Sequence, residues 1–371
     1  MAKNSLRKTS KTIFVVINMV IVVLFLLACL SPWLNPAKFW WIGFLGLLIP
    51  YFIIILLFSV IFWLIAKPKL ALISAVTLLI GWQQISVVLA FHTKNEFEKT
   101  KSKNSIRIVD WNVESFNGLS KNKAIRKHIR EDIAGTITDL EPDIICLQEF
   151  NSTNHSNTET DNIALFAQDY PYYYFSKDYK RSNGVYNSGC IIFSKYPFID
   201  SGRIKYRVAE SLIYADVIKG VDTFRIYTTH LQSFKFKKED YDDIEKIKET
   251  DEEMLAASKN IFYKMKLAFK RRGVQAKTVA EAIAKSPYPS IICGDFNDVP
   301  NSYTYFHIKK DRQDVFLKKG FGVGRSFIAL APTLRIDYVL PDNNFNIQQF
   351  DMVDEGLSDH IMLVTDLSLK K

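Results

Sequence analysis

The stretch "IICGDFNDVP" (291–300) places Asp295 and Asn297 two positions apart, directly after an apolar run. Residues at this spacing face the same side of an extended chain. The carboxylate of Asp295 and the amide of Asn297 would then face the same ligand, to which the carboxylate could transfer a proton and the amide could donate a hydrogen bond. The alternative is an ordinary turn, because Gly, Asp, Asn and Pro are the residues from which turns are built. Other parts of the chain distinguish the two interpretations.

The same pattern of polar residues at the ends of apolar runs recurs along the chain, at Asn112, Glu114, Glu149, His230, Asp337, Asp359 and His360. Taken alone, Glu149 is a strand-end acid and His230 is a buried histidine with satisfied hydrogen bonds. Asp337 is harder to explain, since a carboxylate between Ile336 and Tyr338 needs a partner if it is buried. Catalytic groups of layered folds gather at one rim of the sheet, so we expect a single site.

The elements that must position these residues are short apolar runs alternating with helical stretches. Strands are predicted at 106–112, 144–148, 189–194, 212–218, 224–229, 290–293, 335–340 and 360–367. Helices are predicted at 121–140, 161–168 and 254–285. This mixture predicts a layered α/β or α+β domain.

Seven motifs, in this order along 105–367, resemble those of the endonuclease/exonuclease/phosphatase superfamily: "DWNVES", "IICLQEF", "SGCIIFSKYPF", "YTTHLQS", "ICGDFNDVP", "RIDYVL" and "SDHIML". The resemblance implies an α+β fold, a four-layer α/β/β/α sandwich of two packed mixed sheets flanked by helices. It also implies a hydrolase that cleaves a phosphodiester or phosphomonoester by in-line attack of water.

The resemblance further implies a metal site. Glu149 matches the metal-binding glutamate of the family, expected to hold Mg²⁺ or Mn²⁺ with help from Asn112, and Asp359 and Glu114 are further candidate ligands. Hard cations take oxygen ligands and keep several waters, so a single firm carboxylate is chemically sufficient. Glu114 stands where abasic-site endonucleases have an aspartate.

The remaining residues are given catalytic roles by the same resemblance. His360 matches the general base and Asp337 the carboxylate that orients it, which keeps the required tautomer. Asp295 matches the residue that positions the nucleophile or protonates the leaving group. Asn297 and His230 match hydrogen-bond donors to the phosphoryl oxygens.

The N-terminal quarter holds three apolar runs without a charged residue, at 12–30, 39–65 and 70–91. About 20 apolar helical residues cross a bilayer core, so three transmembrane helices are predicted. The alternatives are buried core helices and, for the first run, a cleavable signal peptide. The predicted organisation is a membrane anchor (1–91), a linker (92–104) and a catalytic domain (105–371) with a charged helical insertion at about 233–287.

Most of the net positive charge of the chain lies in this anchor. Residues 1–91 hold seven basic residues and no acidic ones, which leaves 41 basic against 39 acidic residues elsewhere. A nucleic-acid binder usually carries a basic surplus. We therefore expect the lipid bilayer and a phosphorylated substrate, such as a lipid head group, as partners. Nucleic acid is the alternative substrate, and a basic strip from 259–277 would favour it.

Basic residues also predict the orientation of the anchor. The N-terminal tail and the loop at 66–69 carry six basic residues, whereas the loop at 31–38 carries one. The positive-inside rule then predicts an integral membrane protein with a cytoplasmic N-terminus and an extracytoplasmic catalytic domain. The four cysteines lack metal-type spacing and are expected to be free thiols. An inactive membrane-tethered binding module is a third hypothesis, which predicts loss of a key group.

Overall fold

The computed structural model describes residues 2–92, 96–116, 123–153, 160–208, 210–236 and 251–370. The chain divides into two compact units. The helical unit comprises Met1–Leu89, Phe236–Gly273 and Val299–Phe306, and the sheet unit comprises Ala90–Lys235, Val274–Asp298 and His307–Lys371. Two later segments of the chain thus join the first 89 residues.

The helical unit is built from α1 (Ala2–Ala28), α2 (Trp41–Ala66), α3 (Pro68–Ile80) and α4 (Trp82–Ile85). The middle of α1 packs beside the end of α2, with ring centroids of Phe14 and Phe62 5.4 Å apart. Ser74 Oγ of α3 donates a hydrogen bond of 3.0 Å to Asn18 Oδ1 of α1, and both side chains are buried. A buried polar pair of this kind holds apolar helices together where hydrophobic contact alone is not selective.

The predicted third span, 70–91, is not one helix. It is broken at Gly81, where a Cβ atom would collide with the ring of Phe25, and glycine has a low helix propensity. The 13 residues of α3 rise about 20 Å, less than the roughly 30 Å of a bilayer core. In the described part of the chain, two helical segments are long and apolar enough to cross a membrane, Thr9–Ala28 and Trp41–Ala66.

The sheet unit contains two mixed sheets. The five-stranded sheet has the order β12-β10-β9-β8-β7, with bounds Asp337–Pro341, Ser290–Asp295, Asp222–His230, Ser211–Lys219 and Phe198–Lys205. The seven-stranded sheet has the order β13-β14-β2-β3-β6-β4, with bounds Phe345–Val353, Met362–Leu369, Ile106–Asn112, Ile144–Thr153, Tyr186–Ser194 and Tyr172–Phe175; β5 (Tyr179–Arg181) pairs with β6. A separate two-stranded ribbon joins β1 (Ala90–Phe91) to β11 (Phe321–Gly322).

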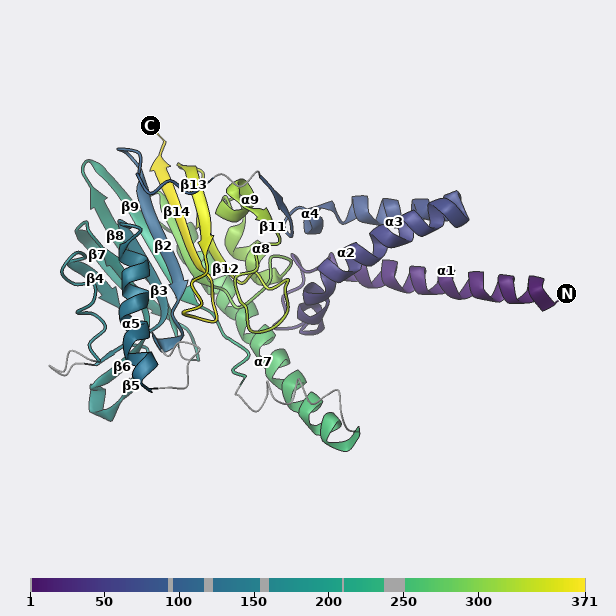
Figure 1. Cartoon of the computed structure of the whole chain (residues 1–371), viewed down its shortest axis with the longest axis horizontal. Helices are drawn as coiled ribbons and strands as arrows, with labels where there is room; N and C mark the ends of the chain where they lie inside the picture. Colours follow the sequence, from purple (N-terminus) through teal and green to yellow (C-terminus); the bar gives the residue numbers. More distant parts are fainter. Residues whose placement is uncertain are drawn as a thin grey trace. The chain divides into compact units, whose positions relative to one another are not determined.

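The main core lies between these two sheets. Ile108 of β2 and Cys146 of β3 belong to the same buried cluster as Ile226 of β9 and Cys293 of β10. Alternate residues of a strand face opposite sides, so the neighbouring residues form a second core beneath α5 (Lys123–Thr138). Figure 1 shows α5 running along the strands of the seven-stranded sheet. The α+β prediction with two mixed sheets is confirmed.

The remaining helices complete the fold. From Val274 onward, α7 (Asp251–Ala284) belongs to the sheet unit, and Tyr227 of β9 donates a hydrogen bond of 3.3 Å to the backbone oxygen of Ala282. The other short helices are α8 (Tyr303–Lys309), α9 (Val315–Lys319), η1 (Glu114–Phe116) and η2 (Ser182–Gly184).

All eight predicted strands are present, several of them longer than predicted. The helix predicted at 161–168 is wrong in the described part of that range, where Asp161 Oδ1 accepts hydrogen bonds from the backbone N–H groups of Ile163 and Ala164 and the chain forms turns. The helices predicted at 121–140 and 254–285 correspond to α5 and α7. Residues 121–122 and the carboxylate-rich part of the predicted insertion, 237–250, lie outside the described residues.

The stretch predicted as a linker (92–104) contains a packed segment. The fully buried guanidinium of Arg107 donates to the backbone oxygens of Glu98 (2.9 Å) and Lys99 (2.7 Å) and to the backbone oxygen of Leu140 (2.8 Å). It also forms a two-pronged ion pair with Asp366, at 2.7 and 2.8 Å. Residues 98–99 are therefore fastened to the edge of the seven-stranded sheet.

Candidate active site

Strand pairing brings three of the predicted residues together. Asp295, the last residue of β10, is the register partner of His230 on β9 and of Asp337 on β12. Asn112 ends β2 and pairs with Gln148 of β3, so Glu149 follows at the same rim. Parallel strands end at the same edge of their sheet, so β9 and β10 bring His230 beside Asp295, and β2 and β3 bring Asn112 near Glu149. Asp337 joins Asp295 as the first residue of the antiparallel strand β12.

Gly294 makes this convergence sterically feasible. Its φ of +132° is accessible to glycine, and a Cβ atom there would collide with the backbone oxygen of Thr229 on the neighbouring strand. β10 and β9 therefore approach closely just before Asp295 and His230. Any side chain at position 294 would push these two residues apart.

Asn297 reaches Asp295 through a turn, not through continued strand geometry. The strand ends at Asp295, and Asn297 has a left-handed φ of +52°. Its backbone N–H donates to Asp295 Oδ1 at 2.7 Å, and its side-chain Nδ2 donates to Asp295 Oδ2 and to the backbone oxygen of Leu231, both at 3.0 Å. The turn interpretation is thus correct locally, and the turn holds the carboxylate of Asp295 in place.

His360 lies between two carboxylates. Its Nδ1 is 2.9 Å from Asp337 Oδ2, and its Nε2 is 3.8 Å from Asp295 Oδ2. Burial opposes protonation of His360, but Asp337 and Asp295 outweigh it and raise its pKa to about 10 in the absence of a cation. Trp111 Nε1 donates to the backbone oxygen of His360 at 2.8 Å, and the Phe327 ring lies 4.9 Å from the imidazole. The ring is therefore fixed on several sides.

His230 lies on the other side of Asp295. Its Nε2 is 3.4 Å from Asp295 Oδ2 and 3.7 Å from Glu149 Oε1, while its Nδ1 is 3.6 Å from Glu210 Oε1. Burial raises the pKa of Glu210 to about 7, and His230 and Lys235 oppose this shift. Glu210 was not predicted. Its only signal in the sequence is a carboxylate that precedes the apolar run of β8, on the strand that pairs with β9.

An oxygen-rich cluster adjoins these residues. The backbone N–H of Glu114 donates to Asn112 Oδ1 at 3.1 Å, and Asn112 Nδ2 donates to Asp295 Oδ2 at 3.1 Å. Burial, followed by the charges of Asp359 and Glu149, raises the pKa of Glu114 to about 7. Within the described residues, the buried Oε2 of Glu114 has no hydrogen-bond partner. The carboxylates of Glu114, Asp359 and Glu149 repel one another, and one oxygen of Glu114 is unpaired. A hard divalent cation, which takes oxygen ligands, would fit this cluster.

Ligand atoms of Asp295, Asp337 and His360 also lie within 4.8 Å of one another, as in a metal site. His360 Nδ1 and Asp337 already bond to each other in this group. The donor set around Glu114 has only oxygen ligands, which Mg²⁺ and Mn²⁺ prefer. The geometry therefore brings all nine predicted residues into one connected site. Within it, the His360–Asp337 pair is distinct from the oxygen-rich cluster around Glu114.

A second residue that was not predicted lies beneath the site. Asp110 of β2 is fully buried, and Gln148 Nε2 donates to its Oδ1 at 2.7 Å and contacts Thr228 Oγ1 at 2.9 Å. Burial, followed by the charge of Asp337, holds the pKa of Asp110 well above its usual range. A charged residue inside the apolar run "IRIVDW" is the same signal that singled out Asp337.

A pocket of about 210 Å³ opens beside Glu149 and His230. Tyr179, Glu210 and Lys235 also line it. The pocket is lined by charged side chains of both signs, which suits a polar group of a substrate held next to the candidate catalytic residues.

Comparison with known proteins agrees with this geometry. Residues 111–360 match the endonuclease/exonuclease/phosphatase family, and residues 11–88 match a domain of unknown function. None of the curated proteins matches the sequence. Two solved structures have a similar fold, each with a TM-score of 0.50 and 19% identity.

One is an endonuclease/exonuclease/phosphatase from Beutenbergia cavernae DSM 12333, for which the match covers 72% of each chain. The other is the human Nocturnin catalytic domain with a bound sulfate anion, for which it covers 72% of this chain and 94% of that one. The family match spans more than half of the sequence and contains the whole site. The chain belongs to the endonuclease/exonuclease/phosphatase family.

Proposed function

We propose that the chain is a membrane-anchored, metal-dependent phosphoesterase that hydrolyses a phosphodiester or phosphomonoester. Members of its family are typically hydrolases that act on phosphoester bonds. The observation that carries the proposal is the arrangement around Asp295, where the His360–Asp337 pair lies on one side and the oxygen cluster with Glu149 on the other. Every residue to which the family resemblance assigns a role is present, which argues against an inactive binding module.

His360 is assigned the role of general base. Asp337 bonds to Nδ1, so the ring presents Nε2 to a water molecule near Asp295. Its raised pKa means that, without a cation, the imidazole keeps its proton at neutral pH. A divalent cation held by Glu149, Asn112, Glu114 and Asp359 would supply positive charge, which lowers the pKa values of neighbouring groups and stabilises charge on the phosphoryl oxygens.

Three further residues are assigned to the phosphoryl group and to the water or leaving group beside it: Asp295, His230 and Asn297. Asp295 orients the attacking water or protonates the leaving group. The pKa of His230 is raised by Glu210, Asp295 and Glu149 against the effect of burial, which keeps an N–H donor for phosphoryl oxygens. Both Nδ2 donors of Asn297 are used by Asp295 and Leu231, so we assign Asn297 first to orienting Asp295.

The membrane anchor is proposed from α1 and α2. Both are long and apolar enough to cross a bilayer, and only 22% and 28% of their most apolar windows are buried. A core helix of a soluble domain would be mostly covered by protein. A third crossing by α3 and α4 would require the break at Gly81 to lie within the hydrocarbon region or at its edge.

The orientation is proposed from the two ends of the helical unit. Lys67 joins α2 to α3 and Lys69 lies in the first turn of α3, at the end of the unit where Phe62 of α2 meets Phe14 of α1, the helix that carries the basic N-terminal tail. At the other end, Ser31 Oγ donates to Asn301 O, within the segment Val299–Phe306 that the sheet unit flanks in sequence. The basic end is expected to face the cytoplasm.

Membrane-impermeant maleimide applied to intact cells tests this orientation. In a Cys29→Ser background, the Lys38→Cys variant should be labelled before lysis, and the Lys67→Cys variant should be labelled only after lysis. Both positions are exposed. The reverse pattern would overturn this orientation of α1 and α2.

A substrate panel tests the proposed activity. Purified full-length chain is assayed with Mg²⁺ against a phosphomonoester, a phosphodiester, a phosphorylated lipid, DNA and RNA. We expect hydrolysis that a chelator abolishes and Mg²⁺ restores. Glu149→Ala should be inactive, and Glu355→Ala, which removes an exposed carboxylate outside the site, should retain activity. Turnover of nucleic acid alone would favour the nuclease alternative, and no turnover of any ester would overturn the proposal.

A further inference from the structure

The ribbon of β1 and β11 exposes two phenylalanine side chains side by side. Phe91 is the register partner of Phe321, and their side chains are 76% and 68% exposed. Directly paired residues of antiparallel strands lie on the same face, so the two rings form one apolar patch. The preceding residue, Ala90, is buried in the core between the sheets. The ribbon is therefore anchored by one face and presents the Phe91–Phe321 patch with the other.

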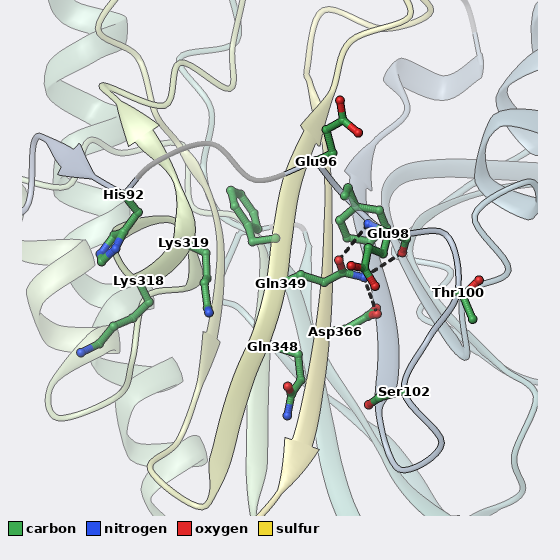
Figure 2. A pocket seen from close by; sticks show the side chains of 12 residues that line it. His92, Glu96, Glu98, Thr100, Ser102, Lys318, Lys319, Gln348, Gln349 and Asp366 are labelled. Carbon is green, nitrogen blue, oxygen red and sulfur yellow. Dashed lines mark hydrogen bonds between the residues drawn. The ribbon is translucent and has the colours of Figure 1, made fainter.

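Two lysines and a histidine flank this patch. Lys318 and Lys319 end α9, just before Phe321, and His92 follows Phe91 with its backbone N–H donating to Gly320 O at 3.2 Å. These three side chains line one side of a pocket of about 480 Å³. Figure 2 shows them on the side opposite Glu96 and Glu98. Two hydrogen bonds between the Glu98 backbone and the Gln349 side chain hold Glu98 in place. The two lysines thus lie on the ribbon side of the pocket.

We propose that the Phe91–Phe321 patch, together with Lys318 and Lys319, contacts the interfacial layer of the lipid bilayer. This inference rests on the proposed membrane anchor. The first argument is continuity of the chain, because Leu89 is the last residue of the apolar segment in the helical unit and Ala90 begins the ribbon. One peptide bond separates them, which leaves about 3.8 Å between their Cα atoms.

The second argument is chemical. Exposed aromatic rings beside lysines have the composition of membrane-interface segments, in which the rings enter the head-group boundary and the cations meet anionic lipid. Two isolated phenylalanines would need no explanation, but a cross-strand pair on a ribbon anchored by the buried Ala90 is a fixed apolar feature. The contact would give the sheet unit an attachment to the membrane surface besides its covalent one, close to a phosphorylated head group.

Spin-label accessibility tests the proposal. The full chain, in a Cys29→Ser background, carries a nitroxide at one of three exposed positions through Phe321→Cys, Val221→Cys or Leu57→Cys; the other native cysteines are buried. The protein is reconstituted in vesicles of phosphatidylcholine and phosphatidylglycerol. Collisions are measured with oxygen, which concentrates in lipid, and with a neutral nickel chelate, which stays in water.

We expect the label at position 321 to collide more often with oxygen than with the chelate, and the label at position 221, in the fully exposed turn between β8 and β9, to show the reverse. The label at position 57, in α2, reports on the anchor. If position 57 is in lipid but position 321 behaves like position 221, the patch proposal is wrong and the anchor stands. If position 57 is accessible to the chelate, the anchor proposal itself fails.

The Lys318→Glu/Lys319→Glu variant tests the charged part separately. With the label at position 321, it should lower the oxygen preference in anionic vesicles and have little effect in vesicles of phosphatidylcholine alone. An equal effect in both lipids would exclude electrostatic attraction to the bilayer as a part of the contact.

Discussion

Asp337 contacts His360 through both carboxylate oxygens, at 2.9 and 3.1 Å from the same ring nitrogen, Nδ1. The carboxylate therefore fixes which nitrogen carries the proton and leaves Nε2 directed toward Asp295. A histidine held in this way is prepared to accept a proton on one side only. The proposed mechanism depends on this pair more than on any other contact in the chain.

Replacing Asp337 by asparagine tests the orienting role. The amide keeps the shape but removes the negative charge, so we expect kcat to fall on the order of 10²- to 10⁴-fold while the fold survives. The pH dependence of kcat should also shift toward lower pH, because Asp337 raises the pKa of His360. Asp222→Asn, at an exposed position of the same sheet, is the matched control. Unchanged kcat in Asp337→Asn would exclude the role.

Gly294→Ala should disrupt the site by changing the strand that carries Asp295. A methyl group there would collide with the backbone of Thr229 and separate β10 from β9, so both stability and activity should fall. Gly135→Ala is the control, because a Cβ atom at this position in α5 meets nothing within 4 Å. It should stabilise the protein by up to about 1 kcal/mol, as glycine is a poor helix former. Equal thermal stability of the two variants would contradict this account of the strand approach.

Binding of Mg²⁺ should strengthen as pH rises from 6 to 8. The pKa of Glu114 is raised to about 7, so below this pH the carboxyl is protonated and a cation must displace the proton. The expected gain is at most about tenfold per pH unit for one proton. Calorimetry in buffers of different ionisation enthalpy measures the proton release directly.

Two variants identify the group that releases this proton. Glu114→Gln should release fewer protons on Mg²⁺ binding, whereas Glu281→Gln, at an exposed position of α7, should behave like the natural chain. Proton release that is unaffected by Glu114→Gln would show that Glu114 does not belong to the cation site.

Arg107→Met should destabilise the sheet unit by about 3–5 kcal/mol, because it leaves Asp366 buried without its ion-pair partner. The double variant Arg107→Met/Asp366→Leu should lose less free energy of unfolding than Arg107→Met alone, since both buried charges are then removed. Denaturant unfolding of the full chain measures the difference. A single variant that unfolds like the natural chain would show that the segment at Glu98 and Lys99 is held by other contacts.

The sequence predicted the elements that are buried on both faces. β2 and β10 are buried along their whole length, and polar residues mark their ends. β13 was missed because it is an edge strand whose polar residues, such as Gln348 and Gln349, face solvent or the neighbouring segment. The break at Gly81 was also missed, since an apolar run gives no sign of a ring from another helix pressing on one glycine.

The site was predictable to the extent that its residues stand at strand ends. Glu210 escaped notice because its relation to His230 depends on the pairing of β8 with β9, which no local pattern reveals. The position of Asn297 was predicted by extended geometry, whereas a left-handed turn produces it. Local patterns thus identified the residue types, and tertiary pairing determined which atoms meet.

The central claim is that His360 activates water for attack on a phosphoester. The most direct measurement compares the Mg²⁺-dependent hydrolysis rate of the full-length natural chain with those of His360→Ala and His128→Ala, the second being an exposed histidine of α5. The account predicts a loss on the order of 10²- to 10⁴-fold for His360→Ala and none for His128→Ala. Hydrolysis by His360→Ala at the rate of the natural chain would contradict it.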